Sequence, residues 1–175
     1  MVILYIYDIN NNIEYKSDDF NILNYDNIIS LKCSKKNLNY LPILPINLIK
    51  LDCGFNNLLN LPILPNFLIK LNCSYNKLID LPILPNSLIK LNCSDNELIS
   101  ISILPKNLIV LYCYINKLIY LPILSNSLIK FNCKINKLSN IPKINNKMKL
   151  LYYDNNTIKY INKISFAISF SVFIF

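Results

Sequence analysis

The 175-residue chain contains no histidine, no arginine and no tryptophan, and it contains a single glycine. Without histidine, a serine or cysteine nucleophile has no imidazole base to activate it. One glycine, Gly54, cannot build the glycine-rich loops that cradle phosphate groups. The absence of arginine removes the side chain that most often reads DNA bases. The sequence therefore predicts a protein with no catalytic residues and no cofactor.

Long apolar runs and a cleavable leader are also missing. Apolar residues make up 53% of the chain, but they recur at fixed positions. They do not form the run of about 20 residues that a membrane-spanning helix needs. The segment 1–9 is apolar but contains Asp8 and no basic residue, unlike a secretory signal. We therefore expect an intracellular protein with no signal peptide and no transmembrane helix.

Cysteine recurs at a fixed interval of 20 residues. The six positions are Cys33, Cys53, Cys73, Cys93, Cys113 and Cys133. A period of about 20 to 50 residues predicts that each unit is one structural turn and that neighbouring units stack into a solenoid. Equivalent residues on adjacent parallel strands would lie about 4.8 Å apart, which exceeds the roughly 3.8 Å between the Cβ atoms of a disulfide. We therefore expect free thiols in the core, a reducing compartment and no metal site, since no CxxC pair is present.

Each unit combines a strand pattern with a proline-containing return. Aligned on the cysteine, the units follow LxxLxCxxNxLxxLPxLPxx and begin at Ile28, Leu48, Leu68, Leu88, Leu108, Leu128 and Met148. Leu51 and Cys53 alternate with Lys50 and Asp52, which predicts a short strand with one buried face. All nine prolines lie in the returning segment, which should be polyproline II or irregular and not helical. The sequence predicts a parallel sheet on the concave side of a shallow curve.

This pattern resembles the leucine-rich repeat family, and in particular its 20-residue LPxLP class, found in bacterial secreted effectors. Cysteine at the sixth position, with this composition, is also similar to leucine-rich repeat proteins of giant DNA viruses. The resemblance implies a curved right-handed superhelix with few or no helices that binds a protein partner. If the chain is viral, that partner is a host protein and the site of action is the host cytoplasm.

Three segments are expected along the chain: an N-terminal cap at 1–27, seven repeats at 28–161 and an apolar cap or tail at 162–175. The tail is too short to span a bilayer. Its partial alternation favours a strand that covers the last repeat, with membrane-interface contact or partner docking as alternatives.

A repeated asparagine follows each strand and is expected to act as a structural ladder beside the cysteines. Its amide offers donors and an acceptor to backbone groups that lose their sheet partners where the chain turns inward. The positions are Asn56, Asn76, Asn96, Asn116, Asn136 and Asn156.

Three columns of outward-facing residues define the expected binding face. The first is Ser30, Lys50, Lys70, Lys90, Val110, Lys130 and Leu150; the second is Lys32, Asp52, Asn72, Asn92, Tyr112, Asn132 and Tyr152; the third is Ser34, Gly54, Ser74, Ser94, Tyr114, Lys134 and Asp154. Two patches are candidate partner sites: the lysines with Asp52, and the tyrosines, whose large rigid side chains are typical of hot spots. The partner-binding candidates are Lys50, Lys70, Lys90, Lys130, Asp52, Tyr112, Tyr114 and Tyr152.

Two alternatives remain for the lysines. Repeat duplication and an AT-rich composition could have copied them without a partner. A nucleic acid or another anionic surface could also bind the repeat region, where seventeen lysines and five acids give a net charge of +12. The missing arginine and the spread of lysines over strand and turn positions argue against nucleic acid.

Overall fold

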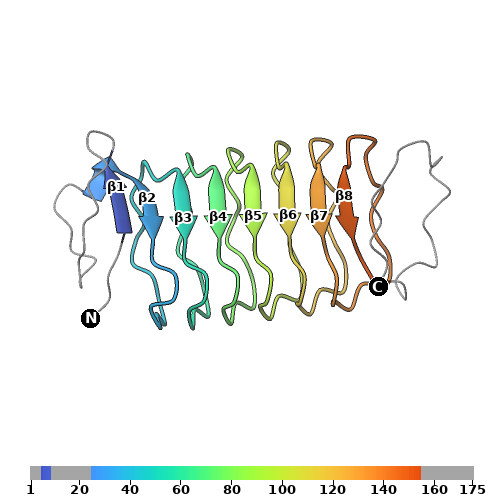
Figure 1. The fold of residues 1–175 in the computed structure, drawn as a ribbon, viewed down its shortest axis with the longest axis horizontal. Coiled ribbons are helices and arrows are strands. Elements are labelled where there is room, and N and C mark those ends of the chain that lie inside the picture. The colour runs from blue at the N-terminus through green and yellow to red at the C-terminus, as the bar shows by residue number, and fades with distance from the viewer. Residues whose placement is uncertain (1–4, 9–24, 155–175) are drawn as a thin grey trace.

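The computed structural model describes residues 5–8 and 25–154. Within these ranges the strands form a single sheet in chain order (Figure 1). Its members are β1 (Tyr5–Asp8), β2 (Ile28–Lys32), β3 (Lys50–Asp52), β4 (Lys70–Asn72), β5 (Lys90–Asn92), β6 (Val110–Tyr112), β7 (Lys130–Asn132) and β8 (Leu150–Tyr152). In the described part of the chain, the one helical element is the 3-10 turn η1 (Tyr25–Asn27). The prediction of a solenoid with few helices is confirmed.

From β2 to β8 all neighbours are parallel and in register. Lys50 pairs with Lys70, and Leu51 with Leu71. Because the same register continues through β8, each repeat position forms a column along the solenoid axis. Most strands span three residues, fewer than the period-2 pattern suggested, but the sheet bonding continues one residue further. The Cys53 N–H, for example, donates to the Asn72 carbonyl at 2.8 Å.

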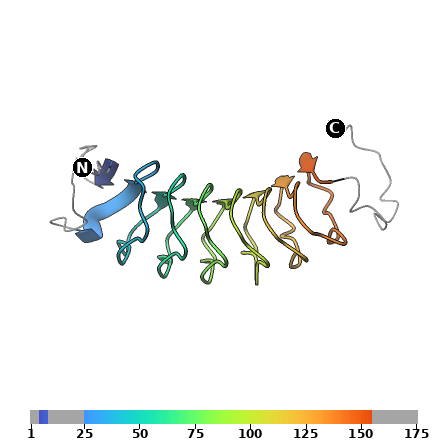
Figure 2. The same ribbon diagram turned by 90° about the horizontal axis from the view of Figure 1, so that it is seen from below.

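The core lies between the sheet and the returning limbs. The central strand residue of each repeat is buried, as Leu51, Leu91 and Phe131 show. Leucines of the LPxLP segment, such as Leu64, approach from the other side. The limbs contain no helix or strand, in agreement with their prolines. Figure 2 shows the strands along one side and the limbs along the other, with both ends raised toward the strand side. The strand face is therefore concave and the curve is shallow.

The two ends of the sheet differ. At the N-terminal edge β1 pairs antiparallel with β2, with Ile6 opposite Leu31. Residues 9–24 and 155–175 lie outside the described residues, so the N-terminal cap, the tail at 162–175 and Asn156 stay predictions. No helix in the described ranges is long and apolar enough to cross a membrane.

Candidate functional site

An asparagine fixes the turn that follows the strand in five consecutive repeats, from β3 to β7, and it is buried in the first four of them and half-buried in the last. The Asn76 side-chain amide donates to the carbonyls of Cys53 and Cys73 at 3.1 Å and of Ser74 at 3.2 Å. Its oxygen accepts the N–H of Leu58 at 3.0 Å. The same bonds recur at Asn56, Asn96, Asn116 and Asn136. Each asparagine thus joins two neighbouring repeats and holds the strands in the register that aligns the columns.

The residue just before each of these asparagines has a left-handed backbone, and so does Lys35, which precedes Lys36 in the first repeat. The positions, with φ between 53° and 58°, are Lys35, Phe55, Tyr75, Asp95, Ile115 and Ile135. Such a conformation is unfavourable for side chains other than glycine, asparagine and aspartate. The bonds of the asparagine ladder hold the turn nonetheless. As a consequence, Phe55 and Tyr75 project from the edge where the strands end, a placement that the sequence patterns did not reveal.

All six cysteines are free and buried beneath the concave face. The Cys53 thiol donates to the Asn72 carbonyl at 3.4 Å, and equivalent bonds recur in other repeats. Burial raises the pKa of Cys33, Cys93 and Cys133 to about 12, and at Cys33 and Cys133 part of that rise comes from the nearby Asp52 and Asp154. Burial also raises the pKa of the remaining three thiols. These thiols stay protonated near neutral pH, a state poorly suited to nucleophilic attack.

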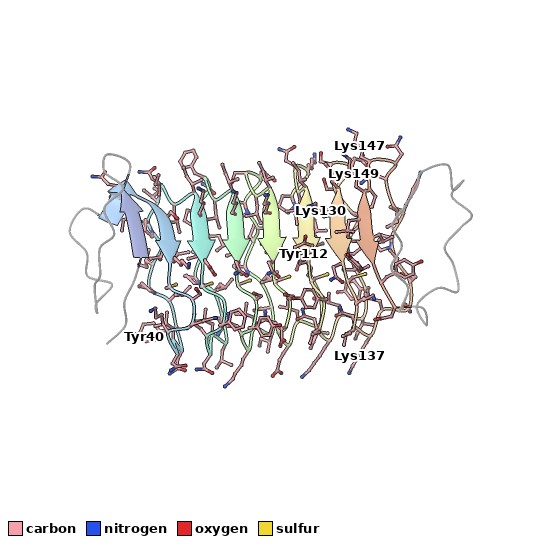
Figure 3. All side chains as sticks on the ribbon, viewed as in Figure 1. Tyr40, Tyr112, Lys130, Lys137, Lys147 and Lys149 are labelled. Atoms are coloured by element: carbon pink, nitrogen blue, oxygen red, sulfur yellow. The ribbon has the colours of Figure 1, made fainter. Side chains whose placement is uncertain are left out.

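The lysine column lies on the open concave face. Lys50, Lys70 and Lys90 are exposed and directly opposite one another in the register of β3, β4 and β5. Val110 interrupts the column, and Lys130 resumes it. Figure 3 places Lys130 and Tyr112 on the sheet. Like charges at neighbouring strand positions repel one another, so the column favours an anionic group above it.

The next column forms its own polar network. Asp52 is half-buried, and its carboxylate accepts the Asn72 amide at 2.9 Å and the Gly54 N–H at 3.3 Å. Asn72 in turn accepts the Ser74 hydroxyl at 2.8 Å. Because these groups already bond to one another, Asp52 offers a partner less free hydrogen-bonding capacity than the exposed lysines do.

The third column corrects a prediction. We expected it to face solvent, but Gly54, Ser74 and Ser94 are buried. The chain has begun its inward turn at this position, one residue after the cysteine, and a Cβ at Gly54 would lie 3.2 Å from the Ser74 carbonyl. Toward the C-terminus the same column carries Tyr114 and Lys134, which are half-buried.

Aromatic side chains gather at the edge where the strands end. Phe55 and Tyr75 stack with their ring centroids 4.2 Å apart, and the Lys35 ammonium lies 5.1 Å from the centre of the Phe55 ring. The pKa of Tyr75 is raised, first by the electrostatic influence of Tyr114, then by burial and by Asp95. We name Phe55, Tyr75 and Tyr114 the aromatic ledge. The sequence analysis placed Tyr114 among the candidates but missed Phe55 and Tyr75, although their 20-residue spacing puts them in one column.

The other predicted tyrosines lie apart. Tyr112 is half-buried on β6, whereas Tyr152 is half-buried on β8, where the Lys134 ammonium lies 5.8 Å from its ring centre. The structure therefore divides the predicted tyrosine patch into three places: the concave face at Tyr112, the ledge at Tyr114 and the C-terminal end at Tyr152.

A groove of about 380 Å³ joins the lysine column to the first tyrosine. It is lined by Lys50, Lys70 and Lys90 on one side and by Val110 and Tyr112 at its C-terminal end. Among the described residues, no three or more Cys, Asp or Glu side chains are arranged to hold a metal ion. The three lysines of the groove offer a ligand positive charge, Val110 offers an apolar wall, and Tyr112 offers a phenol.

Three similar solved structures come from bacteria. YopM from Yersinia enterocolitica WA-314 is similar with a TM-score of 0.75 and 34% identity, over 77% of this chain and 30% of that chain. A Shigella effector LRR domain is similar with a TM-score of 0.68 and 32% identity, over 72% of this chain and 59% of that chain. YopM from Yersinia pestis, titled a leucine-rich effector protein, is similar with a TM-score of 0.59 and 30% identity, over 70% of this chain and 42% of that chain.

The fold is a leucine-rich repeat solenoid. This solenoid spans between 30% and 59% of the three similar chains, so their full-length activities do not transfer to it directly. No protein-family model matches its sequence, and no curated protein matches it either. The resemblance of the leucine-rich repeats to giant-virus proteins rests on the sequence alone. The effector neighbours suggest a protein-interaction module.

Proposed function

We propose that this leucine-rich repeat solenoid is a non-enzymatic interaction module that binds an acidic segment of a partner protein on its concave face. The observation that carries the proposal is the groove in which three stacked lysines meet Val110 and Tyr112. Carboxylates lying over the column would relieve the mutual repulsion of the lysines. An apolar side chain of the partner would pack against Val110, and Tyr112 adds an aromatic contact of the kind enriched in hot spots.

The aromatic ledge extends this surface. Phe55 and Tyr75 are partly exposed and held rigid by their stacking and by the turn beneath them. A rigid aromatic pair loses little conformational entropy on binding. We propose that the partner binds mainly in the groove and makes additional contacts with the aromatic ledge.

The similar structures support the partner class that we propose. Two of them carry the word effector in their titles, and on that basis we propose a host protein as the partner. If the chain is viral, as its resemblance to giant-virus repeat proteins suggests, we propose that the host is the infected cell and that the protein acts in its cytoplasm.

The test is affinity purification from host-cell lysate with quantitative mass spectrometry, followed by affinity measurement on the purified partner. The groove variant carries Lys50→Glu, Lys70→Glu, Lys90→Glu and Tyr112→Ser. We expect it to lose at least about tenfold in affinity, equivalent to about 1.4 kcal/mol. Binding that survives these changes would remove the concave face from the proposal.

A control variant separates the groove from net charge. Lys77→Glu, Lys137→Glu and Lys147→Glu make the same charge change at exposed positions outside the groove. Figure 3 places Lys137 on the loops below the sheet and Lys147 above it. We expect this variant to keep the partner, and an equal loss in both variants would indicate unspecific charge attraction.

An anionic surface such as nucleic acid is the second candidate, favoured by the exposed lysine column. Against it, Lys117 follows the strand β6 and is paired with Glu97 at 3.0 Å, so the lysines do not form one continuous stripe. Filter binding of single- and double-stranded DNA and RNA at low salt tests this candidate. Retention that falls steeply with salt would support it, and absence of retention at low salt would reject it.

A further inference from the structure

The stacked rings of the aromatic ledge border an acidic side chain. The ring planes of Phe55 and Tyr75 are inclined by 8°, and the Lys35 ammonium lies over Phe55. Because the stack follows the column from one repeat to the next, Phe55 covers one face of the Tyr75 ring and the second face points toward the following repeat. The residue at the equivalent position of that repeat is Asp95. The second face of Tyr75 is therefore next to a carboxylate.

Backbone hydrogen bonds hold this carboxylate and a second phenol beside Tyr75. The Asn76 N–H donates to the Asp95 carbonyl at 3.1 Å, and the Asp95 N–H donates to the Tyr114 carbonyl at 2.9 Å. The side chains converge as well, because Tyr114 and, less strongly, Asp95 raise the pKa of Tyr75 electrostatically. Tyr75 is 39% exposed, and the other two side chains are half-buried. Two phenols and a carboxylate thus meet at an accessible aromatic ring.

The charge of Asp95 has no counterpart within the described ranges. The salt bridge in this part of the chain joins the nearby Glu97 to Lys117 and leaves Asp95 without a cation. Aromatic faces attract positive groups, and this chain already uses that attraction where the Lys134 ammonium lies over Tyr152. An aromatic face beside a carboxylate without a cation therefore favours a positive group from outside.

We propose that Tyr75, Asp95 and Tyr114 form a binding site for an arginine side chain of the partner. The planar guanidinium stacks on the second face of Tyr75. Its N–H groups donate to the Asp95 carboxylate and to the Tyr114 hydroxyl, as in other charge-assisted hydrogen bonds. Arginine suits the site better than lysine, because a planar guanidinium can stack and donate at the same time.

The arginine site rests on the proposed function in one respect, since the arginine belongs to the partner that binds in the groove. Lys70 precedes Tyr75 by five residues, and Lys90 precedes Asp95 by five. Five residues of chain span at most about 18 Å, so one partner segment can reach both places. We therefore expect a segment that carries acidic residues and, a few residues away, an arginine.

Nuclear magnetic resonance titration of the whole chain with N-acetyl-arginine methylamide tests the site independently of the groove. We expect chemical-shift changes that saturate at Tyr75, Asp95 and Tyr114, and magnetisation transfer between the Tyr75 ring and the arginine side chain. N-acetyl-lysine methylamide should bind more weakly. Absence of shifts at Tyr75, or equal affinity for the two compounds, would overturn the assignment of the site to arginine.

A matched pair of variants separates the site from net charge. Asp95→Asn should weaken the binding of N-acetyl-arginine methylamide at least about threefold. It keeps the fold, because asparagine tolerates the left-handed backbone at this position, where φ is 53°. Asp80→Asn makes the same charge change at an exposed position outside the ledge and should bind like wild type. Equal affinity of the two variants would overturn the proposal.

Two peptides connect the site to the groove. Both contain the same run of glutamates and a flexible glycine–serine spacer, and they end in arginine or in glutamine. We expect the arginine peptide to bind wild type about fivefold more tightly than the glutamine peptide, and Asp95→Asn to bind both equally. If neither peptide binds while N-acetyl-arginine methylamide does, the groove proposal fails and the arginine site stands. If both peptides bind wild type equally, the arginine site fails as part of the partner surface and the groove stands.

Discussion

Replacing one ladder asparagine should destabilise the whole solenoid, and Asn76→Ala is the sharpest case. The substitution removes the acceptor of the Leu58 N–H, which lies at a residue with no exposed surface. The carbonyls that Asn76 contacts each keep another donor, either a neighbouring asparagine or a backbone N–H. The principal penalty is therefore one buried unpaired donor.

The magnitude follows from that count. A buried donor left without a partner costs about 1–3 kcal/mol, and the net value of a lost hydrogen bond adds about 1 kcal/mol. We expect Asn76→Ala to lower the free energy of unfolding by about 2–4 kcal/mol. The matched control is Asn132→Ala at the equivalent position of β7. Its side chain accepts the Lys134 N–H at 3.2 Å, but both residues are half-buried on the concave side, where water can replace the bond.

The assay is urea denaturation followed by circular dichroism, with both variants and wild type measured together. Asn132→Ala should lose less than about 1 kcal/mol. If Asn76→Ala shifts the unfolding midpoint no further than Asn132→Ala does, the asparagine does not hold the repeats together. The assignment of the ladder as the device that fixes the register would then be wrong.

Three further predictions concern stability. Lys70→Ser should raise the free energy of unfolding by a few tenths of a kcal/mol, because Lys70 lies between two lysines in the register. This gain in stability should shrink as salt is added. Lys77→Ser at an exposed turn serves as the control, and an equal gain in that variant would refute the explanation by repulsion. Ile135→Asn should stabilise by about 1 kcal/mol, since Ile135 has a φ of 56°. The control is Ile119→Asn, because Ile119 is similarly exposed but is not among the left-handed residues, and this variant should gain no stability. Equal gains in the two variants would contradict the explanation by backbone strain. Burial raises the pKa of Cys93 from 9.0 to about 12, so the unfolded state releases this proton first and stability should fall as pH rises from about 9 to about 12. Cys93→Ala should show a shallower fall in urea midpoints across that range, and an identical fall would exclude this thiol as a contributor.

The columns of the solenoid were predictable because two simple periods coincide. Alternation along Lys50, Leu51 and Asp52 gives the inward and outward faces of a strand. The constant 20-residue spacing places equivalent residues in register without any knowledge of contacts. The proline-rich limb follows from the fixed φ of its prolines. These local rules account for the sheet, the core and the lysine column of the groove.

The turn after the strand could not be predicted from the same rules. Its left-handed residue is Phe55 in one repeat, Tyr75 in the next and Ile115 further along. None of these residue types favours that conformation, so the position carries no local signal. The asparagine that follows imposes the conformation through tertiary bonds. The error at Ser74, expected to be exposed but found buried, has the same origin, because the inward turn begins earlier than alternation suggests.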